Sequence, residues 1–175
     1  MKCDLSSCAI ETPEGLVFVD PIALAEHALR GLLAGIQPAA IVLTNGNHTR
    51  AAAKFRERLG VKVFASADAT GLEINPDATL ADGDLIPGGM RIIALPGAGP
   101  GEIALIGDRV VCVGDAVIHL EPDGFRLLPP KYCSDAVCLA DSLRKLLCYQ
   151  FDVMTFAHGA PLAGQARHRL ELLLA

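Results

Sequence analysis

Polar and ionisable side chains follow three apolar, strand-like segments of this sequence. The first group occupies residues 44–50 (TNGNHTR), directly after the apolar run 39–43. Asp115 follows a second apolar segment and His158 follows a third. Because α/β proteins often place functional groups at strand ends, each of these positions is a candidate site. Amide, imidazole, carboxylate and guanidinium groups together could bind a metal ion or an anion, or transfer protons.

Each of these groups also has a structural interpretation. A helix is predicted directly after residues 44–50, so the polar side chains there could cap it, and a helix start also favours an anion. Asp115 could cap a turn. A lone histidine at a strand end, such as His158, is more often a hydrogen-bonded structural residue than a ligand. Residue types alone leave both interpretations open.

The glycine-rich segment 97–101 (GAGPG) is a separate candidate for ligand binding. A dinucleotide-binding loop leads into a helix whose N-terminus meets the pyrophosphate. Here the apolar, β-branched run 102–106 follows, which predicts a strand. We therefore expect a structural loop and no nucleotide site.

Apolar periodicity predicts the elements that must position these residues. Residues 7–12 and 16–20 are expected to form a hairpin, because Pro13-Glu14-Gly15 between them has turn chemistry. The other expected elements are a helix at 22–33, a strand at 39–43, a helix at 49–59, a strand at 61–65, a polar loop at 66–87, strands at 90–95, 102–106 and 110–114, a hairpin at 117–128, a helix capped by Ser134 and running to about Cys148, a strand at 152–156 and a helix at 163–174. This order predicts an α+β fold, a four-layer αββα sandwich, in one domain over residues 1–175.

The composition excludes several classes of function. Of the 175 residues 51% are hydrophobic, and the formal net charge is −5 without a run of basic residues, so we expect a folded protein that does not bind nucleic acid. No apolar stretch could span a bilayer and no signal-peptide pattern opens the chain, which predicts a cytoplasmic protein with no membrane partner. The cysteines should then be buried thiols, with a metal or disulfide site as the alternative for the equally spaced pairs. They are Cys3, Cys8, Cys112, Cys133, Cys138 and Cys148.

The order of these motifs resembles that of the metallo-β-lactamase superfamily, in particular its glyoxalase II-like hydrolases. Residues 11–21 are similar to the family's opening hairpin with its Asp. Residues 41–44 match the strand before the HxHxDH metal motif, and residues 95–102 are similar to the PGHTPGS loop. Residues 113–116 resemble the GDA block, and residues 151–159 resemble the final strand and GHG turn. The resemblance covers nearly the whole chain and implies the same αββα sandwich.

The sequence departs from this family at the metal ligands, which are five His and two Asp around one or two zinc or iron ions. The HxHxDH and PGH ligand positions hold other residue types here: Asn45, Asn47, Thr49, Arg50 and Ala98. Asp115 and His158 keep the family's residue types, and His48 falls between ligand positions. Asn is a weak zinc ligand and Arg50 would repel a cation, so no metal cofactor is expected.

We therefore predict a hydrolase homologue that has lost the dinuclear site and keeps a pocket for a small molecule or an anion. The expected pocket residues are Asn45, Asn47, His48, Thr49, Arg50 and Ala98. Arg50 would contact the anion or pair with Asp115 in place of the metal's charge, and Asp115 with His158 would form an acid–base pair. One alternative is an active ester or thioester hydrolase with one zinc, iron or manganese ion on His48, Asp115 and His158.

A second alternative is a non-catalytic interaction protein that forms homo-oligomers. The C-terminal leucines at 170 and 172–174 would supply the apolar contact face. Docking of these leucines onto the chain's own core is the simpler interpretation.

Overall fold

The structure, a computed structural model, describes residues 5–175. The N-terminal half builds a five-stranded sheet with the order β1 (Cys8–Thr12), β2 (Gly15–Val19), β3 (Pro38–Leu43), β4 (Val63–Ser66) and β5 (Ala78–Leu80). Strand β1 pairs antiparallel with β2, while β2 to β5 run parallel. Parallel neighbours need crossover connections, and two of these carry the helices α1 (Glu26–Leu32) and α2 (Ala52–Leu59).

The C-terminal half builds a second five-stranded sheet. Its strands are, in spatial order, β12 (Leu162–Ala163), β11 (Val153–Thr155), β8 (Val110–Val113), β7 (Ile103–Gly107) and β6 (Arg91–Ala94). Strand β11 runs parallel to β8, and the other pairs are antiparallel. The remaining elements are the hairpin β9 (Val117–Leu120) with β10 (Gly124–Leu127), the 3₁₀ helices η1 (Pro130–Tyr132) and η2 (Arg144–Cys148), and the helices α3 (Ala136–Leu143) and α4 (Ala166–Leu173).

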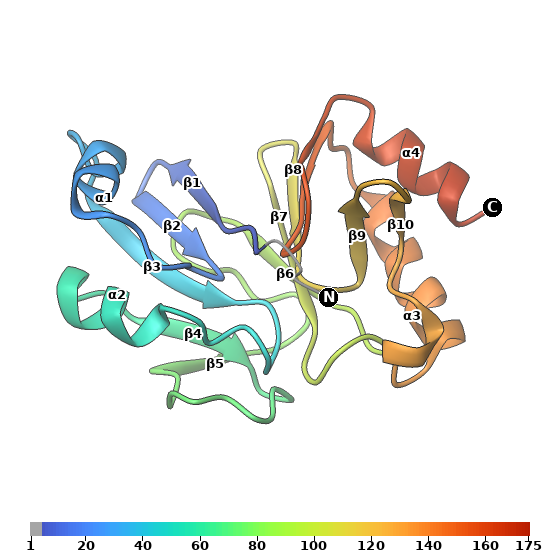
Figure 1. Cartoon of the computed structure of the whole chain (residues 1–175), viewed down its shortest axis with the longest axis horizontal. Coiled ribbons are helices and arrows are strands. Elements are labelled where there is room, and N and C mark those ends of the chain that lie inside the picture. Colours follow the sequence, from blue (N-terminus) through green and yellow to red (C-terminus); the bar gives the residue numbers. More distant parts are fainter. Residues whose placement is uncertain (1–4) are drawn as a thin grey trace.

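Three apolar clusters hold these layers together. Strand β2 alternates, so that Phe18 packs toward Phe55 of α2 with ring centroids 5.2 Å apart, while Val17 faces the second sheet and lies in one cluster with Leu105. The third cluster joins the second sheet to α3 and α4, with Leu143 among its fully buried members. Figure 1 shows α1 and α2 on one outer side, α3 and α4 on the other, and the sheets between them. The predicted αββα sandwich is confirmed.

Several predicted boundaries were wrong. Asp135, not Ser134, caps α3, since its Oδ1 accepts hydrogen bonds from two backbone amides at 2.9 Å. The α-helix ends at Leu143 and continues only as the 3₁₀ helix η2. Helix α1 begins at Glu26, because Ala25 before it is extended and no side chain caps it. The loop predicted at 66–87 contains the short strand β5, and β12 precedes α4.

The glycine-rich segment forms a loop followed by strand β7, as predicted. Gly97 has φ +103°, and a side chain there would collide with the backbone of α3. The loop therefore packs closely against that helix.

The cysteines within residues 5–175 are all free thiols, while Cys3 lies outside the described residues. Cys112 is buried, whereas Cys148 is exposed, so the expectation of uniform burial was wrong.

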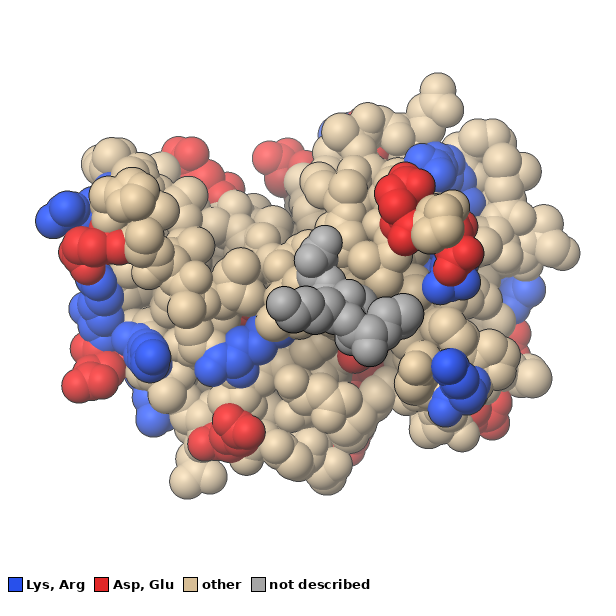
Figure 2. All heavy atoms as spheres, in the orientation of Figure 1, with Lys and Arg blue, Asp and Glu red and all other residues tan. Residues whose placement is uncertain are grey.

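At the C-terminus Leu170 and Leu174 join the core, while Leu172 is 64% exposed. No helix among the described residues is long and apolar enough to cross a membrane. On the face shown in Figure 2, acidic and basic side chains lie in small separate groups.

Candidate functional site

Four strand ends bring polar side chains to one edge of the sandwich. Asp20 directly follows β2, Thr44 follows β3, Asp115 follows β8, and His158 follows β11. Because β2 runs parallel to β3 and β8 runs parallel to β11, their carboxyl ends come out on the same side of each sheet. The loop after β3 adds His48 to this group. The ligand atoms of His48, Asp115 and His158 all lie within 4.8 Å of one another.

Asp20 fixes the orientation of His48. The backbone of Asp20 has φ +48°, an unusual conformation for a non-glycine residue. The Thr44 backbone amide donates to Asp20 Oδ1 at 2.8 Å, and the Thr44 hydroxyl donates to Oδ2 at 2.6 Å. The same Oδ2 lies 2.9 Å from Nδ1 of His48. Since an ionised carboxylate only accepts hydrogen bonds, the proton of this contact sits on Nδ1.

Asp115 lies between two imidazole rings. Its Oδ1 is 3.3 Å from Nε2 of His48 and 3.3 Å from Nε2 of His158. Burial alone would lower the pKa of His48, but hydrogen bonds to Asp115 and Asp20 outweigh it and raise that pKa to about 9. Burial opposes ionisation of Asp115, yet its contacts with His158 and His48 hold the pKa of this carboxyl well below its usual range. Without a metal ion, the structure therefore favours an imidazolium at His48 next to a carboxylate.

A buried amide and a buried acid support Asp115 from the other side. Asn45 donates through Nδ2 to Asp115 Oδ2 at 3.1 Å and to Glu102 Oε2 at 2.7 Å. Glu102 also accepts the backbone amide of Ala116 at 3.0 Å. Burial and the nearby charge of Asp115 raise the pKa of Glu102 to about 8, so this carboxyl is mostly protonated at neutral pH. A side chain at Gly114 would lie 2.8 Å from Glu102 Oε1, so a glycine is needed for this close approach.

Three of the predicted pocket residues, Arg50, Thr49 and Ala98, contact other parts of the protein and do not line the cavity. The guanidinium of Arg50 donates to the backbone oxygens of Ser6 at 2.6 Å, Asp20 at 3.3 Å and Ala157 at 3.3 Å. The predicted pairing of Arg50 with Asp115 is thus replaced by hydrogen bonds that tie three segments together. Burial lowers the pKa of Arg50 from its ordinary value.

Thr49 Oγ1 accepts the backbone amide of Glu73 at 3.1 Å, which anchors a neighbouring loop. Ala98 is fully buried in the core beside α3. Its backbone oxygen accepts a hydrogen bond from the Ser134 amide at 3.2 Å. Both residues therefore support the loops around the site.

A cavity of about 480 Å³ opens beside the three clustered side chains. Asn47, Gly99, Asp115 and His158 form its polar end. The hairpin β9–β10 and the segment after it supply the remaining wall, through Ile118, Leu120, Arg126, Leu128, Pro129 and Tyr132. The volume falls within the range of small-molecule sites, roughly 300–1,000 Å³, and the wall is largely apolar.

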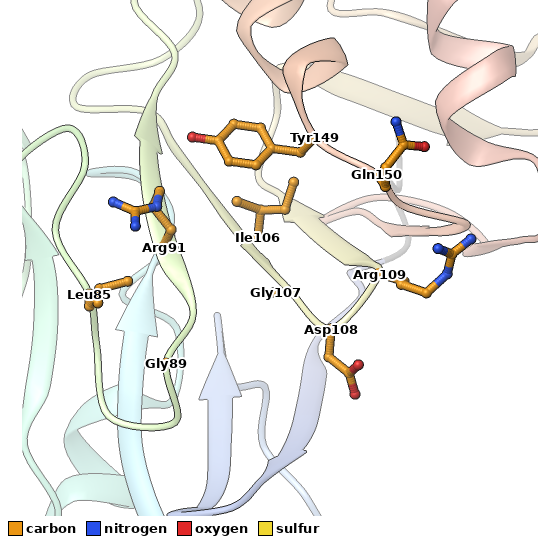
Figure 3. A pocket seen from close by; sticks show the side chains of 9 residues that line it. All are labelled: Leu85, Gly89, Arg91, Ile106, Gly107, Asp108, Arg109, Tyr149 and Gln150. Atoms are coloured by element: carbon orange, nitrogen blue, oxygen red, sulfur yellow. The ribbon is translucent and has the colours of Figure 1, made fainter.

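A second hollow, of about 250 Å³, lies at the turn between β7 and β8. Figure 3 shows Ile106 between Arg91 and Tyr149, while the side chains of Asp108 and Arg109 extend in other directions. Arg91 donates to the Gly83 oxygen at 2.8 Å, and Arg109 pairs with Asp152. Both arginines are thus engaged by the protein itself, and we assign the site to the larger cavity.

Sequence reasoning missed three residues of this site. Asp20 and Glu102 were noticed only within segments that resemble the family, and Thr44 only as the first residue of the candidate loop, so no role was predicted for any of them. Glu102 had a detectable signal, since it is a single acidic residue at the start of an apolar strand segment. Its role depends on contacts with Asn45, 57 positions away, which local patterns do not contain.

Comparison with known proteins gives consistent results. The sequence profile of the metallo-beta-lactamase superfamily matches residues 1–171. The structure is similar to that of TTHA1623 in a di-iron-bound form, with a TM-score of 0.71, 25% identity, and coverage of 98% of this chain and 97% of the other. It is similar to the superfamily protein ST1585 from Sulfolobus tokodaii, with a TM-score of 0.75, 16% identity and coverage of 98% and 80%. It is also similar to the metallo-beta-lactamase from Pontibacter korlensis, with a TM-score of 0.70, 18% identity, and coverage of 94% of this chain and 85% of the other. No curated protein sequence matches the chain.

Proposed function

Because the chain belongs to the metallo-beta-lactamase superfamily, we propose that it is a metal-dependent hydrolase rebuilt around a single ion. The observation that carries this proposal is the convergence of His48, Asp115 and His158 within 4.8 Å. Two imidazoles and one carboxylate suit zinc, and they are also the set used by many mononuclear iron sites. The substrate class that we propose is a small ester or thioester.

Two of the three donor pairs have the spacing of ligands around one ion. Ligands bound to zinc at tetrahedral angles lie about 3.3 Å from one another. Asp115 Oδ1 is 3.3 Å from Nε2 of each histidine. Asp20 holds a proton of His48 on Nδ1, so that Nε2, which faces Asp115, is the nitrogen that would bind the ion once its own proton is released. A carboxylate behind a ligating imidazole is the usual arrangement around protein metal sites.

A second ion does not fit these side chains. The family's further ligand positions hold Arg50 and Ala98, whose side chains offer no ligand atom, and Thr49, whose oxygen accepts the Glu73 amide. A permanent guanidinium charge at Arg50 would also repel a second cation. The proposal is therefore limited to one ion.

The chain's own groups divide the remaining work. Asp20 and Thr44 orient His48, and the Asn45 amide holds Asp115 through Oδ2. A bound divalent ion would supply Lewis acidity and lower the pKa of water at this point. The cavity beside the cluster would bind the substrate with its reacting carbonyl toward His158 and exclude bulk water from it.

Metal stoichiometry tests this proposal. We expect about one equivalent of zinc, iron or manganese per chain by elemental analysis after incubation with each ion and desalting. His48→Ala, Asp115→Asn and His158→Ala should each lose the ion and the hydrolysis of p-nitrophenyl esters and thioesters. His168→Ala, which removes an exposed histidine from α4, should retain both. No ion above background in the wild type, or equal loss in His168→Ala, would contradict the proposal.

One observation favours a second candidate, a metal-free protein that keeps the cavity for ligand binding. Both ring nitrogens of His48 lie within hydrogen-bonding range of a carboxylate, so an imidazolium can neutralise the charge that a metal would otherwise neutralise. In that case the wild type should hold no ion, and His48→Ala should lower its stability, because it leaves Asp115 without this partner. Denaturant unfolding of both proteins measures that loss.

A further inference from the structure

The hairpin β9–β10 presents an arginine to the cavity. Phe125 and Leu127 of β10 pack against the core shared with α3 and α4. Because side chains alternate along a strand, Arg126 between them points to the opposite face. Its cross-strand partner in the register is Ile118, and both residues line the cavity. The hairpin thus supplies an apolar wall with one permanent positive charge in it.

The hydrogen-bonding capacity of Arg126 is only partly used. Its Nη2 lies 2.7 Å from Oδ2 of Asp123, which is half exposed to solvent. Its Nε is buried and has no hydrogen-bond partner within residues 5–175. The guanidinium fork matches a carboxylate geometrically, so an anionic group in the cavity competes with Asp123 for this arginine.

The two ends of the cavity differ in their polar groups. Arg126 places a permanent positive charge on the hairpin wall, whereas the polar end holds the Asp115 and His158 side chains assigned to the proposed reaction. Between them the wall is apolar, through Ile118, Leu120 and Leu128. A ligand that matches this pattern has an anionic group at one end and an apolar body behind it.

We infer that the cavity takes a small apolar carboxylate, whose anionic group binds Arg126 and whose body lies along the β9–β10 wall. For the proposed hydrolase this defines the substrate class as an ester or thioester that carries a carboxylate remote from the reacting carbonyl. The reacting end rests on the proposed function, whereas binding of the carboxylate by Arg126 does not. Arg126 is thus a specificity-determining residue that acts away from the His48, Asp115 and His158 cluster.

A matched pair of ligands tests the inference. Octanoate and octanamide have nearly the same shape and differ in charge. We expect calorimetric titration of the wild type to show roughly tenfold tighter binding of octanoate, the difference that one charge-assisted hydrogen bond provides. The titration is run on protein as purified and after treatment with a chelator, so that a carboxylate bound to a metal ion is recognised.

Variants locate the source of the preference. Arg126→Gln should reduce octanoate binding to the level of octanamide and leave octanamide binding unchanged, which also shows that the cavity is intact. Arg169→Gln should retain the preference, since Arg169 stacks over Phe125 and does not line the cavity. Asp123→Asn removes the competing carboxylate and should strengthen octanoate binding roughly two- to fivefold.

The outcomes separate this inference from the proposed function. Equal binding of the two ligands, binding of neither, or a preference that survives Arg126→Gln would overturn the role of Arg126. A preference lost with the chelator but kept in Arg126→Gln would mean that the anion binds a metal ion. A last outcome is a wild type that holds no metal and still prefers octanoate, with that preference lost in Arg126→Gln. In that case the hydrolase proposal fails and the carboxylate site stands.

Discussion

Replacing Asp20 with asparagine tests how the protein prepares His48 for a metal ion. In the wild type, Oδ2 of Asp20 accepts the Thr44 hydroxyl at 2.6 Å and faces Nδ1 of His48 at 2.9 Å. In Asp20→Asn, Oδ1 can still accept the Thr44 amide, but an NH₂ group replaces Oδ2. This group donates, so it favours the tautomer of His48 with its lone pair on Nδ1 and its proton on Nε2. The ring then presents a proton where a ligand atom is needed.

The expected loss of affinity follows from this change in tautomer. Removal of a carboxylate behind a ligating imidazole costs about 10–100-fold in metal affinity, which is about 1.4–2.7 kcal/mol. We expect Asp20→Asn to fall in this range and His48→Ala to lose more, because it removes the ligand itself. Competition with a chromophoric chelator for Zn²⁺ measures both dissociation constants.

Asp152→Asn is the matched control, because Asp152 is an exposed carboxylate paired with Arg109 on the surface. It should bind zinc with wild-type affinity. If Asp20→Asn also keeps wild-type affinity while His48→Ala loses it, the ligand assignment survives and the orienting role of Asp20 is wrong. If neither substitution matters, His48 is not a ligand.

Other substitutions test the packing and the cysteine chemistry. Gly159 has φ +97°, and in Gly159→Ala the new methyl group would collide with the backbone oxygen of His119 in β9. This substitution should destabilise the fold by about 1–3 kcal/mol in urea unfolding. It should also weaken metal binding, because it shifts the adjacent imidazole of His158. Leu143→Ala should cost about 2–5 kcal/mol in the same assay, whereas Val137→Ala, at a side chain 74% exposed, should change stability by less than about 0.5 kcal/mol. The thiol of Cys112 hydrogen-bonds to Cys8 and lowers the pKa of Cys8 to about 7, so iodoacetamide labelling of Cys8 should rise with pH around pH 7 and then level off. In Cys112→Ala this midpoint should move up toward about 8.5, and an unchanged midpoint would refute the assigned cause.

Most of the fold could be predicted because strong local patterns define its larger elements. The opening hairpin has two short strand-like segments around a Pro-Glu-Gly turn, and the apolar run before Thr44 is too short for a helix. The missed strands β5 and β12 have three and two residues, which is too short for periodicity to register. The end of α3 at Leu143 was missed because the apolar pattern continues into η2, where the backbone tightens to 3₁₀ geometry.

The site was less predictable because its contacts join residues far apart in the chain. Strand ends indicated Asp115 and His158, since both follow apolar segments. The actual partners of Arg50 could not be inferred, because they are backbone oxygens from three segments that only the fold brings together. A lone arginine on the hairpin, Arg126, carried no local signal that separated it from a solvated side chain.

The position of His48 shows how a side chain outside the family's ligand positions can reach the other two residues of the cluster. His48 lies one residue after a family ligand position, yet its ring reaches Asp115 because Asp20 and Thr44 turn it there. Two states of the protein then compete for the same three side chains. In one, Nε2 of His48 carries a proton and donates to Asp115, and in the other a metal ion takes that proton's place. The metal-dependent hydrolase and the metal-free binding protein therefore differ only in what lies between His48 and Asp115, so the metal content of the wild type decides between them.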